Sequence, residues 1–218
     1  MKKDGEFLKM KKIFFALVGL VLAFSASAAP YSEGQQYSAI KQTVAGQPEV
    51  VEFFSFFCPH CYQFEHVWHV SAEVKKELPA NTKYVKYHVD FLGGDFAPAV
   101  SQAWAVAVAL GVEDKVSDAI FDGIQKTQTI TDPASLKATF VKAAGITPEA
   151  YDAAWNSFAV KAFVAQQQKA AADFQIQGVP AVYVNGKYLI NNGGLDTSSM
   201  ENYKLDYANA VKFLVNKK

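Results

Sequence analysis

The feature that most restricts the fold is a strand-like run that leads directly into a pair of cysteines. Val50–Ser55 is almost continuously apolar, which is typical of a strand buried on both faces. Cys58 follows, and Pro59 stands where a proline suits the first position of a helix. We predict a helix from residue 59 to Leu78, where Pro79 would stop it, and hence a strand-to-helix junction at Cys58.

Cys58 and Cys61 are the only cysteines in the 218 residues. Three positions apart, they would be stacked by one helical turn, and neither has another thiol to pair with. Such a pair acts either as a reversible dithiol/disulfide or as half of a metal site. Half of the residues are hydrophobic and 17 are Phe, so the core does not need a disulfide for stability.

The first 28 residues have the pattern of a secretory signal peptide. Five lysines precede an uncharged run over residues 13–24, and Ser25–Ala28 offers small residues for cleavage after Ala28. The apolar run is shorter than the roughly 20 residues of a membrane span, although an uncleaved anchor is the alternative. Met10 is a second possible start. We therefore expect an exported, periplasmic protein that begins at Ala29, in a compartment where disulfides persist.

Charge argues against nucleic acid as a partner. Without the leader, 21 lysines less five and 21 acidic residues less two leave 16 against 19, a net charge of about −3. The chain contains no arginine, the residue best suited to bidentate phosphate recognition.

Turn residues, prolines and N-cap residues in the rest of the chain predict the order of the strands and helices. Strands are expected at 36–40 and at 82–89, the second parallel to the strand at 50–55. A helical block follows, and then a hairpin with Asn185-Gly186 as a two-residue turn and a final helix capped by Thr197 or Ser198. The helical block reads as helices at 98–110, 113–122, 133–144, from Pro148 onward, and at 160–174, with Asp132 and Thr147 as N-caps.

This order and four segments resemble the DsbA family of periplasmic thiol:disulfide oxidoreductases. The segments are Phe53–Glu65, Gln102–Ala107, Gln125–Ile130 and Gly178–Ala181, and the resemblance covers essentially the whole chain after the leader. It implies an α/β thioredoxin fold, a mixed sheet flanked by helices, with an inserted all-helical subdomain. The boundaries we expect are a signal peptide at 1–28, thioredoxin-like parts at 29–90 and 168–218, and the helical insertion at 91–167.

The resemblance also implies an activity. The Cys58–Cys61 disulfide would be donated to unfolded or reduced exported proteins, and a quinone-linked membrane protein of the DsbB type would reoxidise the pair. No other cofactor and no metal is expected, and the protein is expected to be a monomer.

The chemistry of the cysteine pair follows from its place at a helix start. Unpaired backbone N–H groups and the helix dipole stabilise a thiolate on Cys58, and a stable reduced form makes the disulfide oxidising. His60 can add a donor or a positive charge beside that sulfur, or it is an exposed histidine without a role. Cys61, facing inward, would be the resolving thiol.

Four residues outside the motif are further candidates. The resemblance implies a cis Val179–Pro180 bond that faces the dithiol and leaves the Val179 backbone free to bind an extended substrate. Glu52 and Lys86 interrupt apolar strands and are candidates for proton transfer to Cys61, with a structural ion pair or a solvated strand face as alternatives. Glu65 is expected to be only an exposed charge.

Other functions remain open at this point. Cys58, Cys61, His66 and His69 are nominal zinc ligands, but one helix cannot fold both histidines back onto its own start. A disulfide isomerase or reductase on the same fold, or a peptide-binding chaperone, are the further alternatives. His66 and Trp68 depart from the family pattern near the presumed peptide groove, where they bear on substrate preference.

Overall fold

The computed structural model describes residues 30–217. The predicted signal peptide at 1–28, with its cleavage site after Ala28, lies outside the described residues. Tyr31–Lys218 forms one compact unit. Among residues 30–217, no helix is long and apolar enough to cross a membrane.

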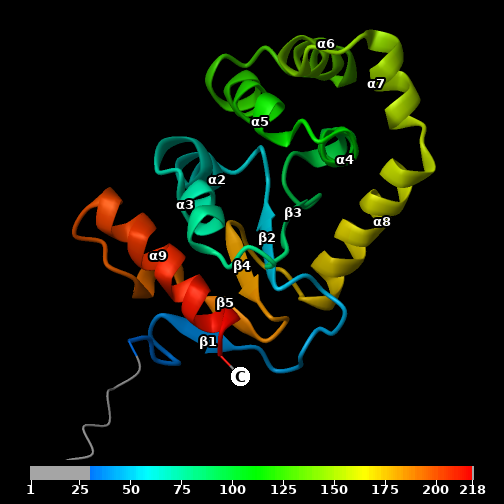
Figure 1. Cartoon of the computed structure of the whole chain (residues 1–218). Helices are drawn as coiled ribbons and strands as arrows, with labels where there is room; N and C mark the ends of the chain where they lie inside the picture. The colour runs from blue at the N-terminus through cyan, green and yellow to red at the C-terminus, as the bar shows by residue number, and fades with distance from the viewer. Residues whose placement is uncertain (1–29, 218) are drawn as a thin grey trace, which may run out of the picture. The chain divides into compact units, whose positions relative to one another are not determined.

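The centre of the unit is a mixed five-stranded sheet in the order β1-β5-β4-β2-β3 (Figure 1). β2 and β3 are parallel, as predicted, and every other neighbouring pair is antiparallel. β2 is buried along its whole length because it lies between β3 and β4 and has helices on both faces. The strands are β1 (Tyr37–Ala39), β2 (Val50–Phe54), β3 (Tyr84–His88), β4 (Ala181–Val184) and β5 (Tyr188–Ile190).

The two faces of the sheet are covered by different parts of the chain. Val50 and Val182 face a core shared with α3 (Val70–Glu77) and α9 (Met200–Val215). Val51 and Phe53, one residue out of step, face α8 (Phe158–Asp173) on the other side. The period of two in a strand therefore sends alternate residues of β2 into two separate cores.

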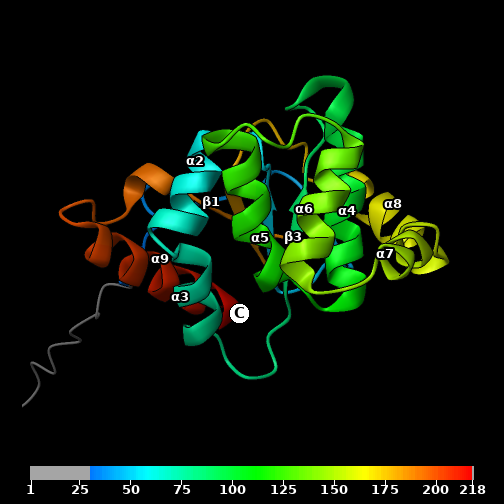
Figure 2. The same cartoon turned by 90° about the horizontal axis from the view of Figure 1, so that it is seen from above.

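The insertion between β3 and β4 forms a helical layer with its own core, which reaches the end of β2 through Phe54 and Phe56 (Figure 2). The inserted helices fall within the segment expected from sequence, whereas its exact boundaries at 91 and 167 remain predictions. In addition to α8, the layer contains η2 (Gly94–Phe96), α4 (Ala97–Leu110), α5 (Glu113–Phe121), η3 (Asp122–Lys126), α6 (Pro133–Ala144) and α7 (Pro148–Trp155).

The long helix predicted from residue 59 to Leu78 is interrupted, so that prediction was wrong. The chain forms α2 (Pro59–Tyr62), continues as the π-helical turn η1 (Gln63–Val67), and restarts as α3. His69 between them has a left-handed φ of 54°. Neither Pro nor Gly marks this break, so no local signal predicts it.

Other local predictions fared unevenly. Asp132 and Thr147 cap α6 and α7, as expected. The helix predicted to end at Gly123 instead continues as η3 to Lys126. Val184 pairs with Tyr188, so the hairpin connection has three residues rather than the predicted two, and Ser199 rather than Thr197 or Ser198 caps α9.

Candidate active site at the start of helix α2

Cys58 caps the N-terminus of α2, directly after β2. Its backbone is extended (φ −91°, ψ 117°), and Pro59 takes the first helical position, where a missing N–H costs nothing. The backbone N–H of Cys61 donates to Cys58 Sγ at 3.4 Å. In its thiol form, Cys58 donates from Sγ to the carbonyl oxygen of Val179 at 3.3 Å. No disulfide joins Cys58 and Cys61 in this structure, and both are buried.

The environment gives the two sulfurs opposite acidities. The Cys61 thiol lowers the pKa of Cys58 to about 6; burial opposes this, while the backbone N–H groups of Cys61 and His60 and the imidazole of His60 contribute to it. Burial raises the pKa of Cys61 far above its ordinary value, and Cys58 and Glu52 add to that rise. Cys58 therefore carries the thiolate while Cys61 holds the proton.

The sequence predicts that the helix start and His60 lower the pKa of Cys58, but it does not predict the larger contribution of the Cys61 thiol. His60 itself is exposed, and its imidazole lowers the pKa of Cys58 less than the Cys61 thiol does. A helical turn brings the thiol at the fourth position of the motif next to the first sulfur. The spacing alone does not show whether this thiol lowers the pKa of Cys58 more than the helix start or His60 does.

Val179 and Pro180 lie opposite the cysteines, immediately before β4. The Val179–Pro180 peptide bond is cis, as the resemblance implied. Both residues are half-buried and line a cavity of about 360 Å³ beside the active site. Its walls come from four parts of the chain: His60 of α2, Phe64 and Trp68, Val179 and Pro180, and Asn192, Thr197 and Tyr203.

The two departures from the family pattern have separate surroundings. Trp68 lines this cavity and contacts the Tyr203 ring at a centroid distance of 5.5 Å. His66 points instead to the helical insertion, where its Nδ1 lies 2.8 Å from Asp118 Oδ1 and its Nε2 lies 3.6 Å from Asp122 Oδ1. Only Trp68 is therefore placed to affect what binds in the cavity.

Glu52 and Lys86 lie opposite one another on β2 and β3 and form a buried ion pair. Lys86 Nζ lies 3.3 Å from Glu52 Oε1, and the exposed fractions of the two residues are 6% and 1%. Ser71 Oγ donates to Glu52 Oε2 at 2.7 Å, and the Tyr84 hydroxyl donates to the same oxygen. The solvated strand face that was an alternative is thereby excluded.

Glu65 joins this pair, so its expected role as an exposed charge was wrong. Lys86 Nζ lies 2.6 Å from Glu65 Oε2, and the carboxylate side chain is 19% exposed. Burial raises the pKa of Glu65, but Lys86 brings it below its ordinary value; burial likewise lowers the pKa of Lys86, and the two carboxylates bring it above. Glu65 lies four residues after the inward-facing Cys61, a spacing that places both on one helix face. We call Glu52, Glu65 and Lys86 the buried charge cluster.

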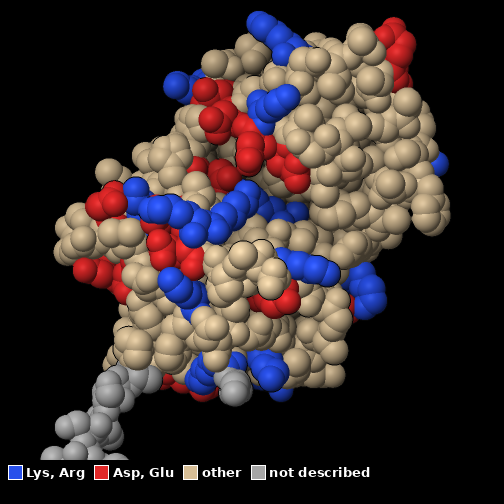
Figure 3. Space-filling model, in the orientation of Figure 1, with Lys and Arg blue, Asp and Glu red and all other residues tan. Residues whose placement is uncertain are grey.

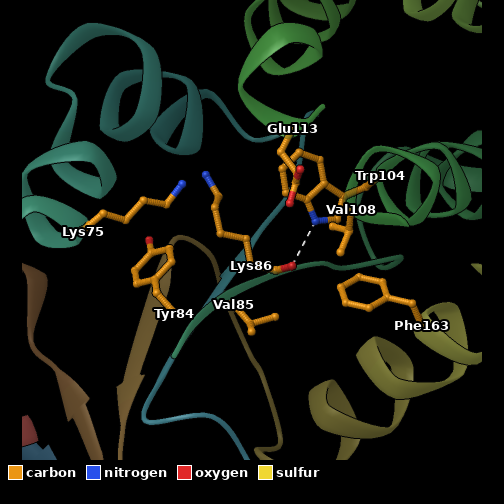
Figure 4. Close-up of a pocket in the computed structure, with 8 residues that line it drawn as sticks. All are labelled: Lys75, Tyr84, Val85, Lys86, Trp104, Val108, Glu113 and Phe163. Atoms are coloured by element: carbon orange, nitrogen blue, oxygen red, sulfur yellow. Dashed lines mark hydrogen bonds between the residues drawn. The ribbon is translucent and has the colours of Figure 1, made fainter. Parts of the chain in front are cut away.

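The buried charge cluster lies next to a second, smaller cavity. Lys75, Tyr84 and Lys86 point into the same space, a cavity of about 120 Å³, and Trp104 Nε1 donates to the carbonyl oxygen of Lys86 at 2.9 Å (Figure 4). Figure 3 shows a band of lysine side chains across the middle of this face, with acidic side chains gathered above it around a hollow.

A second buried titratable group, His88, was not predicted. It ends β3, where its Nε2 accepts from the Phe56 N–H at 3.1 Å and its Nδ1 lies 2.7 Å from Ser101 Oγ, which in turn donates to Asp90. Burial lowers the pKa of His88 to about 3, and Asp90 opposes this. His88 therefore supports the loop before Cys58 as a neutral side chain.

Among residues 30–217, no three His, Cys, Asp or Glu side chains are grouped so that they could hold a metal ion. His69 is exposed, and His66 faces the insertion rather than the cysteines. The four nominal zinc ligands of the sequence are therefore not brought together.

The family model, the relatives by sequence and the solved structures that match this chain all belong to one family. Residues 49–208 match the DSBA-like thioredoxin domain family. The thiol:disulfide interchange proteins DsbA of Escherichia coli K12 and Salmonella typhimurium LT2 are 60% and 61% identical to the chain over 209 residues, which is 96% of this chain and 100% of each relative. The crystal structure of the disulfide oxidoreductase DsbA from Proteus mirabilis matches with a TM-score of 0.83 and 52% identity, covering 87% of this chain and 99% of that one.

A second Proteus mirabilis DsbA structure, of a variant in complex with the non-covalently bound peptide PWATCDS, has the same TM-score of 0.83 at 51% identity and covers 87% of this chain and 100% of that one.

Proposed function

This chain belongs to the family of DSBA-like thioredoxin domains and is a thiol:disulfide oxidoreductase, and from that premise we propose that it works as an oxidase that donates a Cys58–Cys61 disulfide to reduced proteins exported to the periplasm. The observation that carries the proposal is the opposite acidity of the two sulfurs. A disulfide whose reduced form contains a stabilised thiolate accepts electrons readily. The lowered pKa of Cys58, to about 6, supplies that thiolate near neutral pH.

The proposed reaction begins with a substrate thiolate that attacks Cys58 Sγ of the disulfide. A bond forms between the two sulfurs, the Cys58–Cys61 bond breaks, and Cys61 leaves with the electron pair and takes up a proton. A second substrate thiolate then attacks the substrate sulfur of the mixed disulfide, and Cys58 leaves as a thiolate. The substrate has lost two electrons, and the enzyme holds them as a Cys58 thiolate and a Cys61 thiol.

Four neighbours have proposed supporting roles. Pro59 starts the helix whose N–H groups face Cys58. Exposed His60 adds to the stabilisation of the thiolate and lines the cavity of about 360 Å³. Val179 and Pro180 would bind the backbone of an extended substrate next to Cys58. The peptide-bound Proteus relative makes a cysteine-containing peptide a reasonable substrate class for this cavity.

The buried charge cluster is proposed to handle the proton of Cys61. Cys61 leaves as a thiolate in a buried site that disfavours its charge, so it needs a proton promptly. Glu52 acts on Cys61 electrostatically, and Lys86 and Glu65 hold Glu52 in a network that reaches the cavity lined by Lys75. Glu52 and Lys86 are therefore our proton-transfer residues, with Glu65 as an added member.

Reoxidation would require a partner that accepts two electrons from the reduced pair. We propose a quinone-linked membrane protein of the DsbB type for this step, with the monomer as the working form and the Cys58–Cys61 pair as the redox group in place of a separate cofactor. The proposed periplasmic location follows from the leader-like residues 1–28 and the oxidising direction of the reaction.

The test is to trap thiols by acid quenching and alkylation in intact cells that express the full chain. We expect the pair to be mainly oxidised at steady state and Cys61→Ala to accumulate mixed disulfides with exported proteins. A pair found mainly reduced would instead favour the disulfide isomerase or reductase. As a separate check on His60, the reduction potential of His60→Ser should fall to a more reducing value, and an unchanged potential would remove His60 from the site.

A further inference from the structure

One side chain of the helical insertion contacts the backbone on both sides of Cys58. Gln125 Nε2 donates to the carbonyl oxygen of Phe56 at 2.7 Å and to that of Cys58 at 3.0 Å. A side-chain amide nitrogen has two hydrogens, so it can satisfy both acceptors at once. Because both partners are carbonyl oxygens, only the nitrogen of the amide can face them, and this fixes the orientation of the amide.

The position of Gln125 depends on the π-helical turn η3. This turn closes when the Thr127 N–H donates to the Asp122 carbonyl oxygen at 2.8 Å. Ile130 packs against Gly123, where an added Cβ would lie 2.4 Å from Ile130 Cδ1, so the returning chain holds the turn closely. An i→i+5 turn includes one more residue than an α-helical turn, and such insertions are frequent at functional sites. Gln125 is thus presented by a constrained segment.

The same turn contacts α2 after Cys58 as well. Asp122 Oδ1 accepts from the Tyr62 hydroxyl at 2.9 Å and lies 3.6 Å from His66 Nε2. The Tyr62 ring also packs against Phe121 at a centroid distance of 5.9 Å. Contacts on both sides of Cys58 keep η3 seated on the active-site segment, so the Gln125 amide stays aligned with its two carbonyls.

These contacts bear on the reaction through the geometry of Cys58. The Cys58 carbonyl oxygen accepts from the Tyr62 N–H at 3.1 Å in addition to Gln125, and the Phe56 carbonyl lies on the other side of the residue. Fixing the two carbonyls fixes the backbone through Cys58, and with it the direction in which Sγ meets the Cys61 N–H. Thiol exchange requires the reacting sulfurs to be held in a defined orientation.

We propose that Gln125 is a positioning residue of the thiol:disulfide reaction, which holds Cys58 at the helix start from the helical insertion. The inference rests on the proposed role of Cys58 as the attacked sulfur. It gives the insertion a part in the chemistry of the pair, beyond covering the core. Gln125 acts through Cys58, so its removal should change the properties of the sulfur while the fold stays intact.

The experiment compares Gln125→Leu with Gln102→Leu. Gln102 is a matched control: it is a half-buried glutamine of α4 that also donates through Nε2 to a backbone carbonyl, that of Trp155 at 3.1 Å, within the insertion. For each variant we would measure the thiolate titration by absorbance at 240 nm, the equilibrium with glutathione, and denaturant unfolding.

We expect Gln125→Leu to raise the titration midpoint by about half a pH unit to one unit and to shift the glutathione equilibrium about three- to tenfold toward the oxidised form of the enzyme, the size of effect expected for hydrogen bonds of ordinary strength. Gln102→Leu should move neither. Gln125→Asn, too short to reach both carbonyls, should lie in between and serves if Gln125→Leu does not fold.

An unchanged midpoint and equilibrium in folded Gln125 variants, with only a lower unfolding midpoint, would overturn the proposal and make Gln125 a structural tether. Cys58→Ser keeps this outcome separate from a failure of the proposed function. If the titrating thiolate signal persists in Cys58→Ser, then Cys58 is not the thiolate, and the assignment of the reacting sulfur is wrong whatever Gln125 does.

Discussion

The surroundings of Cys58 and those of Cys61 use different chemistry only three residues apart. Around Cys58 the main stabilising groups are neutral donors, the Cys61 thiol and the backbone N–H groups at the start of α2, and the imidazole of His60 contributes less. Beneath Cys61 lie the charged groups of the buried charge cluster, in which two carboxylates share the single ammonium group of Lys86. The comparison teaches that neutral donors at a helix start favour a thiolate, whereas deeper burial and a nearby carboxylate keep the second sulfur protonated.

The largest effect should come from exchanging the two cysteines in turn. Cys58→Ser should reduce the oxidation of a two-cysteine peptide to the uncatalysed rate, because no sulfur remains for the first attack. Cys61→Ala should still form a mixed disulfide between Cys58 and an activated disulfide, but should not release it. Mass spectrometry of the covalent adducts distinguishes the two. Stable adducts on Cys61 in Cys58→Ser would contradict the asymmetry.

Removing the charge of Lys86 should have the largest effect on stability among changes in the buried charge cluster. Lys86→Met leaves Glu52 and Glu65 buried without a counter-charge, which should lower the free energy of unfolding by about 3–5 kcal/mol. Urea denaturation measures this change, and adding Glu52→Gln with Glu65→Gln should recover part of it.

The control for Lys86 is the exposed pair of Lys169 with Asp173. Lys169→Met should change the free energy of unfolding by less than about 1 kcal/mol. Equal losses at Lys86 and Lys169 would mean that burial of the cluster has no energetic consequence.

Acid should lower the free energy of unfolding through His88, the buried histidine that supports the loop before Cys58. Its folded pKa of about 3 lies below the ordinary value of about 6.5, so the unfolded chain binds a proton between these values and the folded chain does not. The free energy of unfolding should therefore fall by about 1.4 kcal/mol per pH unit below pH 6.5, roughly 2–3 kcal/mol at pH 4.5.

Unfolding of His88→Asn at several pH values tests this slope, which should become shallower. Exposed His69 provides the control, because asparagine tolerates its left-handed backbone and His69→Asn should keep the slope of the original chain. If His69→Asn and His88→Asn both keep that slope, His88 is not the group that titrates on unfolding.

The smallest effect should appear at Cys58, in the pH dependence of its alkylation rate. With a pKa of about 6, Cys58 in the reduced protein should react with iodoacetamide at a rate that falls about tenfold per pH unit well below pH 6 and is level above it. Peptide mapping of the alkylated site gives the rate for each cysteine. A midpoint near 8.5 would show that the neutral donors around Cys58 do not stabilise its thiolate.

Local signals predicted most of the fold, because they act over a few residues. Pro59 marks the start of α2, Asp132-Pro133 that of α6, and Asn185-Gly186 a turn with left-handed backbone. The break at His69 carried no such signal, and neither did the turn η3, which contacts α2 through Tyr62 and Asp122.

The residues of the candidate site likewise fall into those that a local motif predicts and those whose partners are distant in sequence. The Cys58–Cys61 pair is a short motif, and the placement of Glu52 beside Lys86 follows from two neighbouring strands. Glu65, Gln125 and His88 could not be assigned roles, because their partners are distant in sequence and become neighbours only after the sheet and the helical layer assemble. Long-range polar contacts of this kind leave no periodicity to read.

The two ends of the described chain meet on the molecule. The Tyr31 ring lies 5.5 Å from that of Phe213, and Lys217 Nζ lies 4.4 Å from the centre of the Tyr37 ring, at the end of the sheet away from α2 (Figure 1). A linker attached after Lys218 would therefore leave the dithiol facing outward. The protein could be immobilised on a resin through its C-terminus as a reusable oxidant, and a short bridge between the two ends offers a route to circular permutants whose new termini lie elsewhere.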